Sequence, residues 1–195
     1  MYLLSDTNAS IKFAAFGAQV FNDHSIMGEI GTCDDIGKKE LKNLATKVTG
    51  KELVECVNCA LNNVNYCIYS YDKYEYWDFD ANYYEEAAEE VLKERSLGGA
   101  CDNDKYFLHQ AITKGEILVT NDLPLYYLAL KVVELGECNI TSGYKVVTVE
   151  DIVIEAYDQG TVTKEQVIAV IEVWDKANRS ILKMKRQLFI DRGLV

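Results

Sequence analysis

Several classes of protein are disfavoured by what this sequence lacks. Its 195 residues include one proline and twelve glycines, which leaves little room for a disordered linker. No apolar run approaches the ~20 residues that a membrane-spanning helix needs. The N-terminus has neither the basic segment nor the long apolar segment of a signal peptide. We therefore expect a cytoplasmic protein with no membrane partner, long enough to bury a sizeable core.

Basic residues are also scarce. Lysine and arginine total 20 against 31 aspartates and glutamates, which gives a net charge of −11. Nucleic-acid-binding proteins usually carry a basic stripe, so this balance argues against a large phosphate-binding surface. It is compatible with a local group of carboxylates that recruits divalent cations. The one concentration of positive charge lies near the C-terminus, at Arg179, Lys183, Lys185, Arg186 and Arg192.

Thiol and imidazole chemistry has little support. The six cysteines should be mostly reduced thiols in a cytoplasmic protein. Cys56 and Cys59 have the spacing of a zinc or redox pair, but they lie in a segment with helical periodicity. No second pair completes four ligands, so we interpret them as core residues. The two histidines, His24 and His109, have no patterned partner, which argues against a Ser/His or Cys/His catalyst.

Two strand-like apolar runs end abruptly in polar residues. The run at residues 2–4 is followed by Ser-Asp-Thr-Asn, and the run at residues 117–119 is followed by Thr-Asn-Asp. Buried parallel strands carry such residues at their C-terminal ends, where α/β proteins keep their chemistry. If the two strands are neighbours, Asp6 and Asp122 lie side by side. Two carboxylates that close repel each other unless a cation or a proton lies between them.

Helical periodicity separates the strand-like runs. This alternation predicts an α/β fold with a right-handed parallel sheet covered by helices on both faces. The stretch 24–31 is either a short strand or a turn, and 144–149 is the last strand. N-cap patterns begin at Thr32, Thr148 and Thr163. The predicted helices cover about 9–22, 32–50, 53–68, 80–95, 102–114 and 123–136, followed by the segments after Thr148 and Thr163, the last of them continuous to about 188.

Two further acids lie on predicted helices. Glu40 is at the edge of an apolar helix face, where a carboxylate can reach the end of a sheet, although a solvated glutamate fits the pattern equally well. Asp104 falls in the first turn of a helix capped by Asp102 or Asn103, where the helix dipole offsets part of the cost of holding a carboxylate. A capping role alone would also explain Asp104.

Aromatic residues are concentrated between two of the helices. Their rings could stack on unpaired bases. Acids rather than lysines or arginines interleave them, so we favour a structural role in a helical hairpin or a dimer face. The residues are Tyr66, Tyr69, Tyr71, Tyr74, Tyr76, Trp77, Phe79, Tyr83 and Tyr84.

Together these motifs resemble the PIN domain, a family of metal-dependent nucleases. The matching features are a first strand that ends in Asp-Thr-Asn, the pair Glu40-Leu41, the Asp104 to Ala111 spacing, and a strand that ends in Thr-Asn-Asp. The resemblance covers the first strand and about residues 97–130, and the helix around Glu40 more loosely. It does not account for the tyrosine-rich segment or most of the C-terminal helices.

The resemblance implies a three-layer α/β/α sandwich around a central parallel sheet. Residues 1–150 would form the PIN-like domain, with a helical, tyrosine-rich insert at about 60–95. Residues 151–195 would be a helical extension packed on the same domain. Many PIN domains are the toxin half of a toxin–antitoxin pair, so the resemblance also implies a protein regulator of antitoxin type and a homodimer.

The resemblance further implies an endoribonuclease that hydrolyses single-stranded or structured RNA, with DNA as the other substrate. Mg²⁺ or Mn²⁺ would be the cofactor, because hard divalent cations favour carboxylate oxygens. The metal ligands and catalytic residues would be Asp6, Glu40, Asp104 and Asp122. Asn8 and Thr120 would orient the acids or a water molecule. Asp102 competes with Asp104 for its role, and Glu29 competes with Glu40.

Two readings of other classes stay open. One is a catalytically silent PIN-like module that keeps the acids but serves a protein partner. The other is a phosphatase of the haloacid dehalogenase type, which also places an aspartate after its first strand. That chemistry requires a second aspartate two residues later, where this chain has Asn8. We rank the phosphatase below both PIN-like readings.

Overall fold

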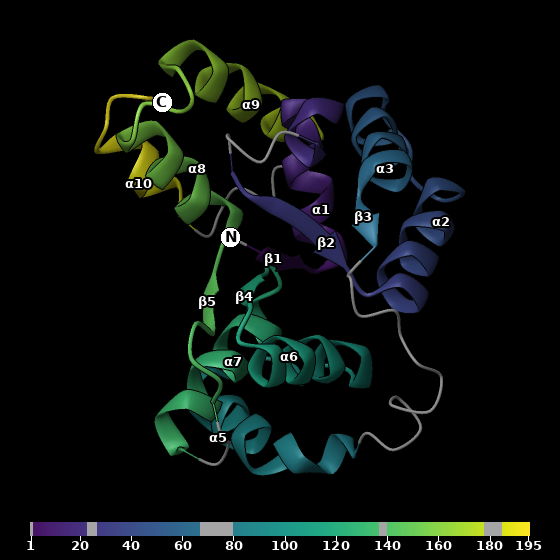
Figure 1. Cartoon of the computed structure of the whole chain (residues 1–195), viewed down its shortest axis with the longest axis vertical. Coiled ribbons are helices and arrows are strands. Elements are labelled where there is room, and N and C mark those ends of the chain that lie inside the picture. Colours follow the sequence, from purple (N-terminus) through teal and green to yellow (C-terminus); the bar gives the residue numbers. More distant parts are fainter. Residues whose placement is uncertain (1, 23–26, 67–79, 137–139, 178–184) are drawn as a thin grey trace.

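The fold is built on five parallel strands. The structure is a computed structural model that describes residues 2–22, 27–66, 80–136, 140–177 and 185–195. The strands lie in the order β3-β2-β1-β4-β5 (Figure 1). Leu4 of β1 is in register with Gly31 of β2 and with Leu118 of β4. Their bounds are β1 Tyr2–Ser5, β2 Glu29–Thr32, β3 Asn65–Tyr66, β4 Ile117–Val119 and β5 Lys145–Val147.

Helices connect successive strands, as parallel pairing requires. The α-helices are α1 Thr7–Phe13, α2 Lys39–Ala45, α3 Lys51–Asn63, α5 Glu85–Arg95, α6 Asp102–Lys114, α7 Leu123–Leu135, α8 Val149–Asp158, α9 Lys164–Ala177 and α10 Arg186–Ile190. Other helical turns are η1 Ala14–Phe16, η2 Ala18–Phe21, η3 Asp34–Lys38 and η4 Ala81–Tyr84. In the described part of the chain, no helix is long and apolar enough to cross a membrane.

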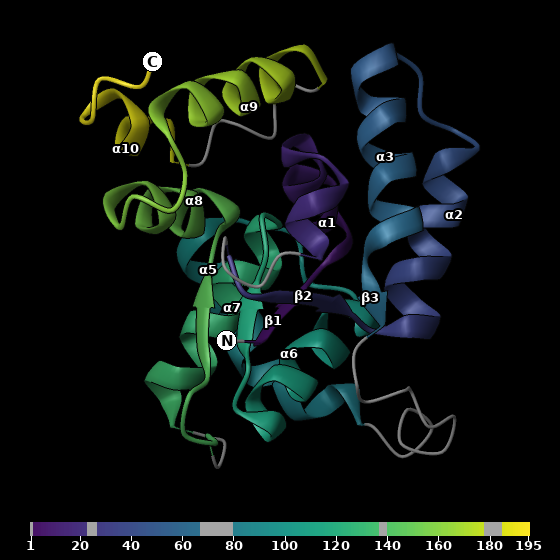
Figure 2. The ribbon, with the colours of Figure 1, turned by 45° about the horizontal axis from the view of Figure 1, so that its top comes forward.

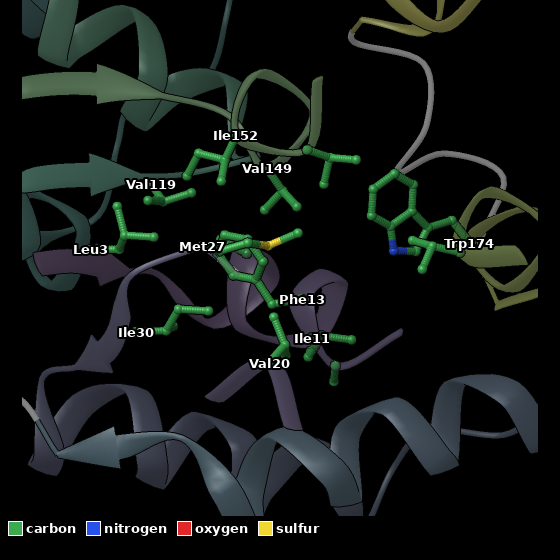
Figure 3. Close-up of a cluster of buried hydrophobic side chains, with 14 of the residues drawn as sticks. Leu3, Ile11, Phe13, Val20, Met27, Ile30, Val119, Val149, Ile152 and Trp174 are labelled. Carbon is green, nitrogen blue, oxygen red and sulfur yellow. The ribbon is translucent and has the colours of Figure 1, made fainter. Parts of the chain in front are cut away.

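Alternate strand residues point to opposite faces of the sheet, and each face has its own core. Leu3 and Val119 pack with residues of α1, α3, α8 and α9. Leu4 and Leu118 pack with residues of α5, α6 and α7. Figures 1 and 2 show these two groups of helices on opposite sides of the sheet, and Figure 3 shows part of the first core. The expected α/β fold, with a parallel sheet buried on both faces, is therefore confirmed.

The C-terminal helices belong to the same core as the sheet. Val149 and Val153 of α8 are fully buried against Leu3 and Val119, so α8 begins before the boundary expected at residue 150. The indole N–H of Trp174 in α9 donates to the backbone carbonyl of Lys12 in α1, at 2.9 Å. The N-cap patterns at Thr148 and Thr163 are both present, as hydrogen bonds to residues 151 and 166.

Four helix predictions were wrong in their extent. The helix expected over 32–50 is a helical turn at 34–38 followed by α2, which ends at Ala45. The helix expected over 9–22 begins at Thr7 and stops at Phe13, after which Gly17, with φ of 84°, separates two short turns. The helix expected over 53–68 ends at Asn63, because the chain becomes extended at Val64 and pairs with β2 as β3. The last helix was expected to continue to about 188, but Lys185 has non-helical backbone (φ of −138°) and precedes a separate helix, α10; the segment 178–184 is outside the described residues.

Two predicted N-caps were also wrong. Thr32 is the last residue of β2 and the helical turn that follows is capped by Cys33. The N-cap of α6 is Cys101 and not Asp102 or Asn103. In both cases a cysteine with extended backbone takes the position. Of the tyrosine-rich segment, residues 67–79 lie outside the described residues, whereas Tyr84 is buried and Tyr83 is exposed.

Cys56 is a buried residue of α3, in the core with α1 and α9. Burial raises the pKa of its thiol to about 11, with smaller contributions from Cys59 and from two glutamates of the same helix. A thiol with so high a pKa is a poor nucleophile and a poor metal ligand at neutral pH. This environment fits the core role expected for it.

Candidate metal-binding acid site

Asp6 lies at the C-terminal end of β1, where it caps α1. Its backbone N–H donates to the carbonyl of Val119 at 3.1 Å, which extends the β1–β4 pairing by one residue. Its Oδ1 accepts from the N–H of Ala9 at 2.6 Å, and its Oδ2 accepts from the hydroxyl of Thr120. The residue is 5% exposed. Strand pairing and helix capping together fix this carboxylate at the edge of the sheet.

Thr120 connects Asp6 to the turn that carries Asp122. Its hydroxyl donates to Asp6 and accepts from the backbone N–H of Asp122 at 3.0 Å, so both of its hydrogen-bonding functions are used. Asp122 is the N-cap residue of α7, but its carboxylate forms no capping hydrogen bond. The structure thus places Thr120 in contact with one of the predicted acids and with the backbone of another.

Asp104 is the third residue of α6. Its Oδ2 accepts from the backbone N–H of Cys101 at 3.0 Å, so it forms part of a capping box. The expected capping role is therefore present. Burial is the main cause of the raised pKa of Asp6 and of Asp122, and the charge of Asp104 adds to both.

Glu40 is in the first turn of α2, between the turns that carry Asp6 and Asp104. Its Oε2 accepts from the hydroxyl of Thr7, the residue after Asp6. Its Oε1 accepts from the side-chain amide of Asn103, the residue before Asp104, at 3.2 Å. Neither contact partner was identified from the sequence. We use the name acid site for Asp6, Glu40, Asp104 and Asp122.

The electrostatics of the acid site are unfavourable in the absence of a cation. Burial raises the pKa of Asp6 to about 7; the hydrogen bonds from Thr120 and Ala9 oppose this rise, and Asp104 and Asp122 add to it. Burial and the charge of Asp104 raise the pKa of Asp122 to about 6. Near neutral pH the site therefore retains protons that a cation could replace.

Counter-charge for the acid site is sparse. Among the residues that the structure describes, no ion pair includes any of its four acids. Within the same ranges, no group of three or more His, Cys, Asp or Glu side chains is arranged to hold a metal ion. The four acids are thus near one another at one edge of the sheet, without the convergence of a preformed metal centre.

The other sequence candidates lie elsewhere. Asn8 is exposed in the first turn of α1, and it has no hydrogen bond to the acids among the described contacts. Asp102 is exposed at the start of α6. Glu29 is opposite Tyr2, at the N-terminal end of the strands, whereas Asp6 follows the C-terminal end of β1. At ~3.3 Å per residue, Glu29 is about 13 Å from the acid site along the strand.

A buried ion pair lies beneath the acid site. The ammonium of Lys12 contacts Glu150 Oε1 at 2.5 Å, and the two side chains are 1% and 0% exposed. The amide of Asn121 donates to Glu150 Oε2 at 2.7 Å, while its Oδ1 accepts from the N–H of Val149 at 3.3 Å. This pair joins α1, which follows Asp6, to α8, and Asn121 connects it to the turn that precedes Asp122.

The indole of Trp174 covers the same lysine. The Lys12 ammonium is 4.9 Å from the centroid of that ring. Burial lowers the pKa of Lys12, and Glu150 and Asp6 oppose this change. Lys12 and Glu150 were not identified from the sequence, since 138 positions separate them and neither belongs to a motif. The contact of Asn121 with Glu150 was therefore not predicted either, although Asn121 is part of the Thr-Asn-Asp motif.

Replacing one member of the buried pair should destabilise the protein strongly. Lys12→Met leaves the Glu150 carboxylate buried with Asn121 as its remaining side-chain donor, at an expected cost of ~3–5 kcal/mol in the free energy of unfolding. The double variant Lys12→Met/Glu150→Met should be more stable than Lys12→Met, because no unpaired charge remains. Urea unfolding of the wild type, Lys12→Met, Glu150→Met and the double variant measures both effects. A double variant whose cost equals the sum of the single costs would contradict this pairing.

The raised pKa of Asp6 should make the metal-free protein less stable at high pH. The pKa of Asp6 rises from 3.8 to about 7 on folding, so between these values the unfolded chain loses its proton first and the free energy of unfolding decreases as pH rises. Above pH 7 the loss is complete, at on the order of 4–5 kcal/mol from ~1.4 kcal/mol per unit of pKa shift. Asp6→Asn should therefore raise the melting temperature in EDTA at pH 8 more than at pH 5.

Asp102→Asn is the control, because it changes an exposed acid of α6 by the same chemistry. It should leave the pH dependence of the melting temperature unchanged. An Asp6→Asn protein that melts below the wild type at pH 8 would show that the carboxylate of Asp6 is stabilising as it stands.

The chain was compared with protein-family models, with curated proteins and with solved structures, and none of these comparisons found a match. Its function is therefore inferred from the geometry of the acid site.

Proposed function

We propose that this chain is a divalent-metal-dependent nuclease that hydrolyses phosphodiester bonds in RNA. It would be a PIN-like nuclease with the three-layer α/β/α arrangement of that family. One observation carries the proposal. Asp6, Asp104 and Asp122 come from three different segments at the C-terminal edge of one parallel sheet. There burial raises the pKa of Asp6 and of Asp122, the charge of Asp104 adds to both rises, and the charge of Asp122 adds to that of Asp6. A fold gains no stability from such an arrangement, so a ligand of opposite charge is its best explanation.

The donor set fits a hard divalent cation. All four acids offer carboxylate oxygens, which Mg²⁺ and Mn²⁺ favour. Asp6 accepts one hydrogen bond at each oxygen, and a carboxylate oxygen can accept a further interaction. The carboxylate of Asp122 is not used for capping. These residues would hold the cation, with Glu40 completing the set from α2.

Bound there, the cation would supply charge neutralisation for the phosphodiester and lower the pKa of a water nucleophile. The side chains of the chain itself have separate tasks. Thr120 fixes the rotamer of Asp6, and Asn121 fixes the turn that carries Asp122. Thr7 and Asn103 hold Glu40 beside them. A reaction that depends on position and charge benefits from carboxylates fixed in this way.

A second function has specific support. Both oxygens of Glu40 already accept hydrogen bonds from the chain, and the described residues contain no ready-made three-ligand metal site. These facts favour a catalytically silent PIN-like module that keeps the acids but binds no catalytic metal and serves a protein partner. A protein regulator of antitoxin type is compatible with either function.

If the chain is a metal-dependent nuclease, variants of the acid site should lose metal binding and RNA cleavage together. Mn²⁺ should bind the wild type more tightly at pH 8 than at pH 5.5, because the acids with raised pKa must lose their protons first. Asp6→Asn and Asp122→Asn should each weaken binding and slow cleavage of a fluorogenic RNA by at least ~10²-fold, the scale seen when one charge-stabilising group is lost. Calorimetry and the cleavage assay measure the two effects.

Two matched variants serve as controls. Asp102→Asn removes a neighbouring exposed acid, and Glu29→Gln removes an acid at the opposite end of the strands. Both should bind Mn²⁺ and cleave RNA like the wild type. If Mn²⁺ binds neither the wild type nor the controls, the silent module becomes the better account. Undiminished cleavage by pure Asp6→Asn protein would refute the nuclease mechanism.

A further inference from the structure

Two cations lie over two adjacent tyrosines on α7. The guanidinium of Arg95, the last residue of α5, is 3.8 Å from the ring centroid of Tyr127. The ammonium of Lys185 is 5.2 Å from the ring centroid of Tyr126. The two rings contact each other edge to face, with centroids 5.5 Å apart. We use the name cation–tyrosine surface for Arg95, Tyr126, Tyr127 and Lys185.

This surface adjoins the acid site at Asp122. Tyr126 is one helical turn after Asp122, to whose carbonyl its N–H donates at 2.9 Å. Side chains on a helix lean toward its N-terminus, so the tyrosine rings extend back toward the turn that carries Asp122.

Lys185 is held to the same region from the other side. Its ammonium contacts Asp151 at 2.5 Å, and Asp151 accepts from the N–H of Thr148 at the N-terminus of α8. The next residue, Val149, donates to Asn121. Residues from α5, α7 and the chain after α9 therefore meet beside the acid site.

The surface is accessible and retains unused positive charge. Arg95 is exposed and forms no ion pair within the described ranges, although the chain carries eleven more acids than basic residues. Lys185 is 25% exposed; of the three N–H groups of its ammonium, Asp151 accepts one and the hydroxyl of Tyr126 accepts another at 3.5 Å, which leaves one. Both tyrosines are partly exposed. Aromatic rings flanked by cations can stack bases and bind phosphates of an unpaired strand.

We propose that the cation–tyrosine surface binds single-stranded RNA and leads it into the acid site. This inference rests on the proposed function and names the surface that would hold the substrate. Tyr126 and Tyr127 stack on unpaired bases, and Arg95 and Lys185 contact phosphates on either side. Such a surface would also explain how a protein with a net charge of −11 can bind a polyanion. A short local strip is sufficient where a broad basic face is missing.

Binding is measured without metal, so that cleavage cannot interfere. A fluorescently labelled 12-nucleotide single-stranded RNA of mixed sequence is titrated with the intact protein in EDTA, at several salt concentrations. Arg95→Gln should weaken binding several-fold at low salt and reduce the slope of log affinity against log salt by about 0.7, the value for one phosphate contact on a single strand. Tyr126→Leu should weaken binding about tenfold, as the loss of one base stack does, without changing the slope.

Each variant has a matched control. Lys93→Gln removes a basic residue of the same helix, two positions from Arg95, that is 64% exposed and paired with Glu90. Tyr83→Leu removes an exposed tyrosine outside this surface. Both should bind like the wild type with an unchanged salt slope. Because Arg95 is exposed, its variant should fold normally, and it decides the question if a tyrosine variant is unstable.

The outcomes separate this proposal from the nuclease proposal. Equal binding by the wild type, Arg95→Gln and Tyr126→Leu would refute the RNA-binding role of this surface. The nuclease proposal would be unaffected, because Mn²⁺-dependent cleavage is measured separately. The absence of RNA binding at low salt would also refute that role of the surface. Tighter binding of the DNA oligonucleotide of the same sequence would refute its assignment to RNA. Weakened binding and a reduced slope support the surface, even in a protein that proves unable to cleave.

Discussion

The parallel pairing of β1 with β4 is the constraint on which the candidate site depends. It brings the C-terminal ends of two strands, more than a hundred residues apart in sequence, to one edge of the sheet. The pairing continues through the N–H of Asp6, and Thr120 then bonds both Asp6 and the backbone of Asp122. The position of these carboxylates is therefore a consequence of strand register, and a shift by one residue would turn each to the opposite face.

Charged side chains near the acid site are of two kinds: carboxylates whose burial opposes folding, and a lysine that is paired with a glutamate. Asp6 and Asp122 are partly desolvated and repelled by Asp104, whereas the buried ammonium of Lys12 has Glu150 as a close partner. A buried pair of this kind adds little net stability over apolar residues, but it fixes the groups it joins. Here it joins α1 to α8. The C-terminal helices thus support the acid site from below and do not form a detached extension.

Local patterns were sufficient for part of this structure. Apolar runs that end in acids predicted β1 and β4, and hydroxyl N-caps predicted the starts of α8 and α9. These patterns succeed because each depends only on residues close together in the sequence. The contacts of Glu40 with Thr7 and Asn103, and the Lys12–Glu150 pair, could not be predicted, because tertiary packing creates them. β3 was missed for the same reason: two residues become a strand only through pairing with β2.

The central claim is that the acid site binds a divalent cation. A crystal structure of the protein grown with Mn²⁺, with anomalous scattering used to locate the metal, tests it most directly. We expect a manganese peak coordinated by carboxylate oxygens of Asp6, Asp104 and Asp122 at distances of ~2.0–2.3 Å, in the range of small hard cations. A structure at saturating Mn²⁺ with no peak between these aspartates, or with metal bound only elsewhere on the surface, would contradict it.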